Sequence, residues 1–183
     1  MDARSVPELV AAMAGGGRPR FAFFWGHRPQ RPGVVDGSCF SQWWPARFTV
    51  GGVSFGSAEH YMMWRKAVLF GDDQKAAAIV KARSPAQAKA LGRAVSGFDE
   101  IVWVEHRWDI VVDGSVAKFA SDPVLGDYLV ATKNRVLVEA SPRDRIWGIG
   151  LSGDSEFAER PAKWRGLNLL GFALMEARAR LWQ

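Results

Sequence analysis

The segment from Ser57 to Ala67 constrains the fold most, because it has a helix-forming pattern but no broad polar face. Ser57 is a favoured N-cap residue, and Glu59 falls in the first turn, where a carboxylate complements the helix dipole. At 100° per residue, Glu59 and Lys66 share one stripe with apolar residues, and the opposite stripe is apolar too. Burying the charges of Glu59 and Lys66 on such a helix costs free energy unless they are paired or line a cleft that contains water.

Two interpretations of these charges follow. In the structural one, Glu59 is a capping acid and Lys66 a surface group whose stem packs on apolar neighbours. In the functional interpretation, Glu59 is a carboxylate held beside a ligand site, and Lys66 supplies positive charge deeper in that site. For an arbitrary helix the structural interpretation is the more common outcome, so the pattern alone leaves both open.

The length predicts a single domain, and the pattern of elements along the chain predicts an α+β fold: a helix-rich domain with a small sheet of short strands. The chain has 183 residues, of which 48% are hydrophobic and 23% charged, as in ordinary soluble domains. Residues 1–18 contain an Ala-rich helical pattern from Pro7 to Met13 and then three glycines, which indicates a flexible N-terminal lead-in. The domain itself is expected over residues 19–183.

The net charge of +5 favours anionic ligands, although no run of Lys or Arg exceeds two residues. Cys39 is the only cysteine, and the three histidines show no ligand spacing, so we expect no metal and no cofactor. The chain shows no signal-peptide pattern and no membrane-length apolar window, which predicts a cytoplasmic protein without membrane association.

Periodicity and turn residues predict the order of elements. Short strands or extended segments are expected at 21–25, 40–44, 47–55 and 136–139, with a hairpin turn at Gly51-Gly52. Helices are expected from Ser57, over 72–82, 85–95, 98–112 and 123–131, and from a cap at Asn168 to Trp182. A glycine-rich loop is expected over 144–153.

Lys89 and Arg93 lie one turn apart on the helix expected over 85–95, with Gly92 beside them. Like charges at this spacing weaken an isolated helix slightly, and an anion between them would offset the repulsion. Gly92 permits close approach of a ligand or another helix. A solvated basic face explains the same pattern, and taken alone it is the more common outcome.

The loop after residue 143 places Asp144 three positions before Trp147, which could bring a carboxylate and a flat ring together. A turn whose tryptophan fills the core is the alternative. Trp103 could stack on a planar ligand or pack in the core, and Glu139 could cap a strand or act in a site. The chain has no GxSxG nucleophile motif and no dinucleotide fingerprint, so acids, bases and tryptophans favour hydrolysis at a sugar carbon over acyl transfer.

Several short motifs together resemble the NADAR family (NAD- and ADP-ribose-associated, YbiA-like proteins). The resemblance covers about residues 21–181, and its specificity comes from the order and spacing of the motifs. They are Phe40-Ser41-Gln42-Trp43-Trp44-Pro45, Ser57-Ala58-Glu59-His60-Tyr61-Met62, Lys66-Ala67, Phe70-Gly71-Asp72, Ala88-Lys89, Leu91-Gly92-Arg93, Trp103, Lys118-Phe119, Leu137-Val138-Glu139-Ala140, Asp144 to Gly150, Trp164, Gly166, Asn168, Leu170 and Gly171.

The resemblance implies an N-glycosidase, a hydrolase acting on N-glycosyl compounds. Family members act on ribosylamino-pyrimidine phosphate intermediates of riboflavin synthesis or remove ADP-ribose from modified bases. The implied partner is a phosphorylated ribosyl-base or ADP-ribose-type small molecule, with ADP-ribosylated nucleic acid as a further candidate. The chain departs from the family pattern at Gln42 and at Ala120-Ser121-Asp122. These departures bear on how a ribose or phosphate is held, and so on the identity of the substrate more than on the type of reaction.

By analogy with glycoside hydrolysis, the resemblance assigns catalysis to Glu59, on the ribose side, and Asp144, as the second acid. Substrate binding is assigned to cations that hold phosphate, to tryptophans that stack on the base and to one glycine: Lys66, Lys89, Arg93, Trp103, Trp147 and Gly148. A non-catalytic module that binds ADP-ribose or an NAD-type nucleotide is the alternative, and it would not need Glu59. A nucleic-acid-binding protein is a third possibility.

Overall fold

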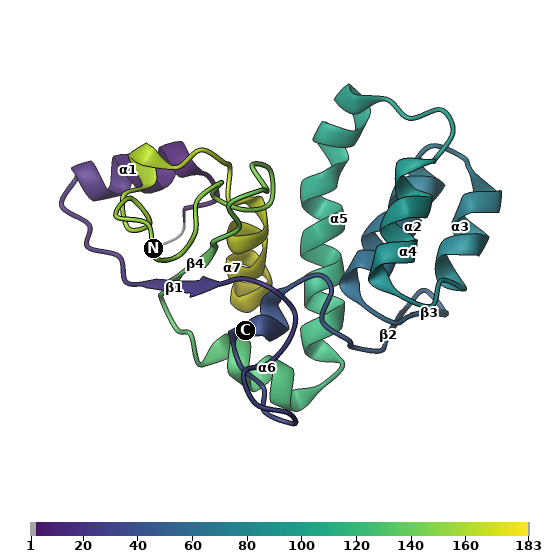
Figure 1. The fold of residues 1–183 in the computed structure, drawn as a ribbon, viewed down its shortest axis with the longest axis horizontal. Helices are drawn as coiled ribbons and strands as arrows, with labels where there is room; N and C mark the ends of the chain where they lie inside the picture. Colours follow the sequence, from purple (N-terminus) through teal and green to yellow (C-terminus); the bar gives the residue numbers. More distant parts are fainter. Residues whose placement is uncertain (1–2, 183) are drawn as a thin grey trace. The chain divides into compact units, whose positions relative to one another are not determined.

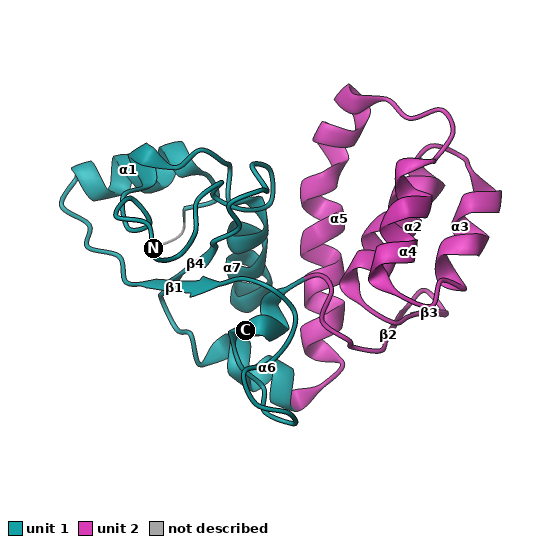
Figure 2. Cartoon of the chain, in the orientation of Figure 1, with its two compact units in different colours: residues 1–41, 124–183 teal, residues 42–123 magenta. Residues whose placement is uncertain are grey.

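The computed structural model describes residues 3–182, and its seven α-helices and two small sheets confirm the α+β class (Figure 1). The chain divides into two compact units (Figure 2). Unit 1 combines residues 1–41 with 124–183, and unit 2 is the continuous segment 42–123. No helix within residues 3–182 has both the length and the apolar character needed to cross a membrane.

Unit 2 begins with an antiparallel hairpin of β2 (Phe48–Val50) and β3 (Val53–Phe55). Gly51 and Gly52 form the turn with φ of 56° and 80°. Two successive positive φ values are typical of the tight turns that suit the twist of a hairpin, and glycine adopts them without steric cost. The predicted hairpin is confirmed.

Three short helices follow, and each starts at the polar residue that the sequence predicts. They are α2 (Ala58–Leu69), α3 (Asp73–Val80) and α4 (Pro85–Arg93). The Asp72 carboxylate accepts a hydrogen bond from the Lys75 amide at 2.9 Å, and the Ser84 hydroxyl accepts one from the Gln87 amide at 3.2 Å. Because these caps satisfy amides that have no partner within the helix, they define where each helix begins.

The long helix α5 (Glu100–Ala120) completes unit 2 and extends beyond the predicted range of 98–112. It packs against α2, where Gly114 faces Tyr61. A Cβ at position 114 would lie 2.6 Å from Cδ1 of that ring, so only glycine lets the two helices approach this closely.

Unit 1 contains a parallel pair of strands, β1 (Phe21–Phe24) and β4 (Val136–Glu139), in the register Phe21↔Val136. Its helices are α1 (Val6–Ala14), α6 (Pro123–Val130) and α7 (Leu169–Leu181). Helix α7 packs on β4 (Figure 1), and the first three residues of β4 are fully buried. This packing explains why β4 is a continuous apolar run.

One local prediction was wrong, and another was correct in position only. Residues 40–44 are not extended: a 3-10 helix, η1 (Gly37–Phe40), is followed by a turn, because the Asp36 carboxylate accepts a hydrogen bond from the Ser38 amide at 2.9 Å and caps it. Asn168 precedes α7 but does not cap it through its side chain. Its backbone is left-handed, with φ of 52°, and its amide group bonds to β4 instead.

Candidate active site

Glu59 lies in the first turn of α2 and is only 2% exposed. Its backbone amide donates a hydrogen bond of 2.9 Å to the carbonyl of Gln42, which ties the helix start to the residue that opens unit 2. The side chain of Ser57, not that of Glu59, caps the helix. A buried carboxylate that is not the cap is the arrangement expected of a functional acid, and the positive end of the helix dipole favours its charge there.

His60, next to Glu59, holds the start of α2 against the segment after α3. Its Nδ1 lies 2.7 Å from the Ser57 hydroxyl, and its Nε2 lies 3.2 Å from the carbonyl oxygen of Ala82. A carbonyl only accepts, so Nε2 carries the proton, and in the neutral ring Nδ1 accepts from Ser57. Burial lowers the pKa of His60, although the Ala82 contact opposes this. The ring is therefore neutral near pH 7.

The structure brings together two predicted binding residues, Lys66 and Trp103. The Lys66 ammonium lies 3.8 Å from the centre of the Phe98 ring and 5.7 Å from that of Trp103. Burial lowers the pKa of Lys66, whereas the nearby Glu100 carboxylate acts in the opposite direction. Trp103 is 8% exposed, so most of its surface is packed, and cation–π attraction holds the ammonium in this aromatic pocket.

Lys89 and Arg93 lie on α4, as predicted, but in different surroundings. Lys89 is half-buried, with its ammonium 5.8 Å from the centre of the Trp43 ring, whereas Arg93 is exposed. Gly92 packs on the Met63 side chain, and a Cβ there would overlap its sulfur atom. The glycine thus serves the α2–α4 contact, and the basic pair is presented on the outer side of α4.

The other predicted residues lie in unit 1, where Asp144 organises a loop. Its Oδ1 accepts hydrogen bonds from the amides of Ile146 at 2.9 Å and Trp147 at 2.8 Å. This side-chain turn fixes the backbone around Trp147, whose ring is half-exposed. The carboxylate of Asp144 is therefore bound to the backbone of Trp147, and proximity of the carboxylate to the indole ring stays a prediction.

Gly148 follows in a confined position against the end of β4. A Cβ at this position would lie 2.8 Å from the carbonyl oxygen of Glu139 and 3.0 Å from Cβ of Ser141. The Glu139 carbonyl also accepts a hydrogen bond of 2.9 Å from Ile149. Gly148 therefore lets the loop pack directly on the strand end, and Glu139, a half-buried acid, lies beside it.

Sequence reasoning assigned no role to His60 or Trp43. The spacing of Ser57 and His60 was a usable local signal, because a cap residue and the residue three positions on share one helix turn. No such signal links Trp43 to Lys89, since their contact depends on how α4 packs in unit 2. Within residues 3–182, no three His, Cys, Asp or Glu side chains cluster as metal ligands would.

Comparison with known proteins gives four informative matches. The sequence pattern of the NADAR domain matches residues 23–182. An N-glycosidase of Acanthamoeba polyphaga mimivirus is 41% identical over 164 residues, which are 87% of this chain and 95% of that protein. The chloroplastic riboflavin biosynthesis protein PYRR of Zea mays is 35% identical over 133 residues, 68% of this chain but only 19% of that protein. The NMR structure of the E. coli protein YbiA is similar, with 26% identity, a TM-score of 0.69 and coverage of 89% of this chain and 86% of that one.

Proposed function

Because this chain belongs to the NADAR domain family, we propose that it hydrolyses the N-glycosidic bond between a base and the ribose of a phosphorylated substrate. The chain is thus a hydrolase acting on N-glycosyl compounds, as its N-glycosidase relatives are named. The observation that carries the site assignment is the burial of Glu59 at the start of α2, with a different residue as the cap.

In this reaction the bond between the ribose C1′ and the base nitrogen breaks, water supplies a hydroxyl group to C1′, and a proton goes to the base. The transition state resembles an oxocarbenium ion, so a carboxylate near the ribose lowers its energy. We assign Glu59 to this position, where it orients the water or stabilises the positive sugar. The His60 bridge between Ser57 and Ala82 keeps the first turn of α2 in place.

We assign Asp144 as the second carboxylate, serving the leaving base. Its Oδ1 is used by two backbone amides, so Oδ2 is the atom that would act on substrate. Trp147, which the same turn fixes, would stack on the base or exclude water, and Gly148 keeps the loop packed on β4.

Phosphate binding is assigned to the basic residues of unit 2. Lys89 combines an ammonium with the neighbouring Trp43 ring, which suits a ligand that has both a charge and a planar group. Arg93 adds a second cation on the same helix face. Lys66 and Trp103 form the other candidate contact, although their mutual packing gives them a structural role as well.

The substrate class follows from the relatives' names. Both the maize protein and one from Vibrio vulnificus are named riboflavin biosynthesis proteins, so a ribosylamino-pyrimidine phosphate is the first substrate to test. ADP-ribose attached to a base is the second. Its ribose-to-base bond has the same chemistry, and the positive net charge of the chain suits both anions.

The test is a substrate panel with identification of the released base. Ribosylamino-pyrimidine phosphates, their dephosphorylated forms, NAD and a base carrying ADP-ribose would be incubated with the protein and with its Glu59→Gln variant. We expect base release from one phosphorylated substrate, and loss of that release in the variant. The exposed Glu105→Gln on α5 is the matched control. Tight binding without release from any substrate would instead establish a binding module.

A further inference from the structure

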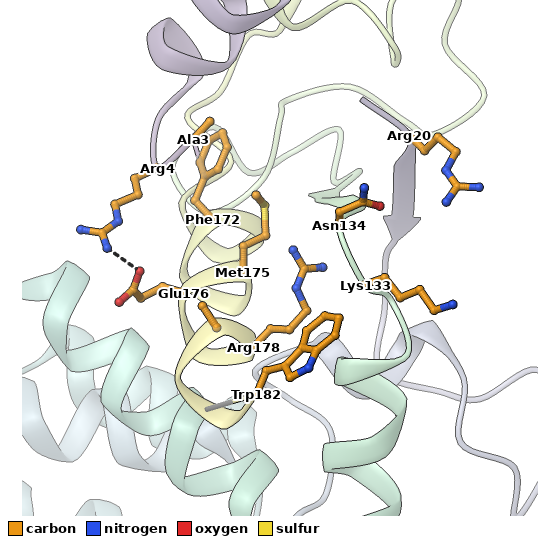
Figure 3. Close-up of a pocket in the computed structure, with 11 residues that line it drawn as sticks. Ala3, Arg4, Arg20, Lys133, Asn134, Phe172, Met175, Glu176, Arg178 and Trp182 are labelled. Carbon is orange, nitrogen blue, oxygen red and sulfur yellow. Dashed lines mark ion pairs between the residues drawn. The ribbon is translucent and has the colours of Figure 1, made fainter. Parts of the chain in front are cut away.

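Unit 1 contains a cavity that shares no residue with the proposed reaction. It has a volume of about 720 Å³ and is lined by α7, the turn before β4 and the residues on either side of α1 (Figure 3). This volume is in the range of sites for nucleotide-sized ligands. All of its lining residues belong to unit 1, so the cavity is defined within that unit.

Arg178 of α7 is the most informative lining residue, because it is charged and only 6% exposed. Figure 3 shows its guanidinium pointing from α7 towards the turn at Lys133 and Asn134. Its Nη1 donates to the Thr132 hydroxyl at 2.7 Å and to the Arg135 carbonyl at 2.9 Å, both neutral acceptors. No carboxylate within residues 3–182 forms an ion pair with it. A buried charge held only by neutral groups is costly, and an anion in the cavity would offset that cost.

The charges around Arg178 are also unbalanced. Among the described residues that line the cavity, Glu176 is the only acid, and it is already bound by Arg4 at 2.8 Å and by Arg180 at 3.1 Å. Arg20 and Lys133 add two exposed cations to the lining. The lining formed by residues 3–182 therefore carries an excess of positive charge that Glu176 does not neutralise.

Lys133 occupies a backbone position that suits glycine better than lysine. It follows the end of α6 with a left-handed φ of 53°, and its amide bonds to the Val130 carbonyl at 2.9 Å. Residues at this position after a helix are usually Gly or Asn, because a Cβ is disfavoured there. Lys133 lines the cavity, so the lysine is kept at this turn at some conformational cost.

We propose that this cavity binds an organic phosphate of nucleotide size, with the phosphate at Arg178, Lys133 and Arg20 and a planar ring on Trp182. The Trp182 indole lines the cavity and is 60% exposed, so it offers a flat surface for stacking. Three cations around one cavity match a diphosphate better than a single carboxylate.

The probes are ADP, pyrophosphate and adenosine, each titrated calorimetrically into the full chain. Lys133→Gly is the main variant, because it removes the ammonium and relieves the left-handed position, so it should melt no lower than the parent. We expect it to weaken ADP and pyrophosphate binding about tenfold, the loss of one charge-assisted contact, and to leave adenosine unchanged. The exposed Lys163→Ala on η2 (Pro161–Lys163) is the charge-matched control.

Further variants separate the phosphate and ring contributions. Trp182→Ala should weaken ADP but not pyrophosphate, and Arg20→Ala should weaken both. Arg178→Gln keeps a hydrogen-bond donor and removes the charge, so circular dichroism would first confirm its fold. Equal phosphate affinity in the parent, Lys133→Gly and Arg20→Ala would overturn the proposal. The Lys89→Ala variant, which removes a phosphate contact proposed for the hydrolysis, should bind ADP in this cavity as the parent does, which keeps the result independent of the proposed hydrolysis.

Discussion

The two carboxylates assigned to catalysis are held in opposite ways. At Glu59 the local structure is maintained by other atoms: Ser57 caps the helix, and the backbone amide of Glu59, not its side chain, bonds to Gln42. At Asp144 the carboxylate itself builds the local structure, because Oδ1 binds two backbone amides. A substitution at the first position therefore leaves the helix cap and the Gln42 hydrogen bond in place, whereas one at the second also changes the hydrogen bonds that shape a loop.

The largest expected effect is that of Glu59→Gln on turnover. Removing the charge while keeping the shape should lower kcat by about 10³-fold or more, the size expected for a group that stabilises transition-state charge. KM should change by less than about threefold, since the phosphate contacts remain. Single-turnover kinetics and a melting curve measure both. A tenfold or smaller loss of kcat would remove Glu59 from the mechanism.

Asp144 should respond differently to its two simplest substitutions. Asp144→Asn keeps an oxygen that can accept from Ile146 and Trp147, so we expect kcat to fall about tenfold with little loss of stability. Asp144→Ala loses the turn as well, and we expect a fall of about 100-fold with about 1–3 kcal/mol of destabilisation. Kinetics and chemical denaturation of both variants check this. Equal activity in Asp144→Asn and the parent would show that Asp144 stabilises the turn and takes no part in catalysis.

A smaller effect is expected at the phosphate contacts of unit 2. Lys89→Ala and Arg93→Ala should each raise KM by about tenfold and change kcat little, because they act on binding in the ground and transition states alike. The dephosphorylated substrate serves as the control, since its KM should not respond. A similar increase for both substrates would show that these residues act through packing and not through phosphate.

The smallest effect is a pH dependence of stability, and it concerns the surroundings of Glu59. The pKa of His60 is lowered in the folded chain, so below its ordinary value of 6.5 the unfolded chain binds more protons. Stability should therefore decrease as pH falls from about 6.5 towards the folded pKa. Denaturation at pH 7.5 and 5.5 measures this slope, which should shrink in His60→Gln and stay the same in the exposed His106→Gln. If the change of stability with pH were the same in His60→Gln as in the parent, the buried His60 ring would not be its cause.

Features that depend on neighbours in the sequence were predictable. The starts of α2, α3 and α4 follow from Ser57, Asp72 and Ser84, and the hairpin follows from two adjacent glycines. For Glu59 the helix pattern left no broad polar face, but it did not decide between a capping acid and an acid beside a ligand site.

Features that depend on distant segments were not predictable. The Asn168 amide binds β4, and the Lys66 ammonium lies over rings supplied by the segment before α5 and by α5 itself. Residues 40–44 looked extended because they are rich in aromatic residues, which favour strands, and the decisive cap at Asp36 lies outside that run. Contacts of this kind leave no periodic trace in the sequence.

The position of Asn168 has a consequence for how copies of this protein behave in concentrated solution. Its side-chain amide donates to the Leu137 carbonyl and accepts from the Glu139 backbone amide, and the Glu139 carbonyl accepts from the Ile149 amide. These three backbone groups of β4 face away from β1. That edge of β4 therefore has no free groups at these positions to template a strand from another molecule. Replacing Asn168 would leave the Leu137 carbonyl and the Glu139 amide without these bonds, so the protection of this edge rests partly on a side chain that acts as a substitute for a third strand.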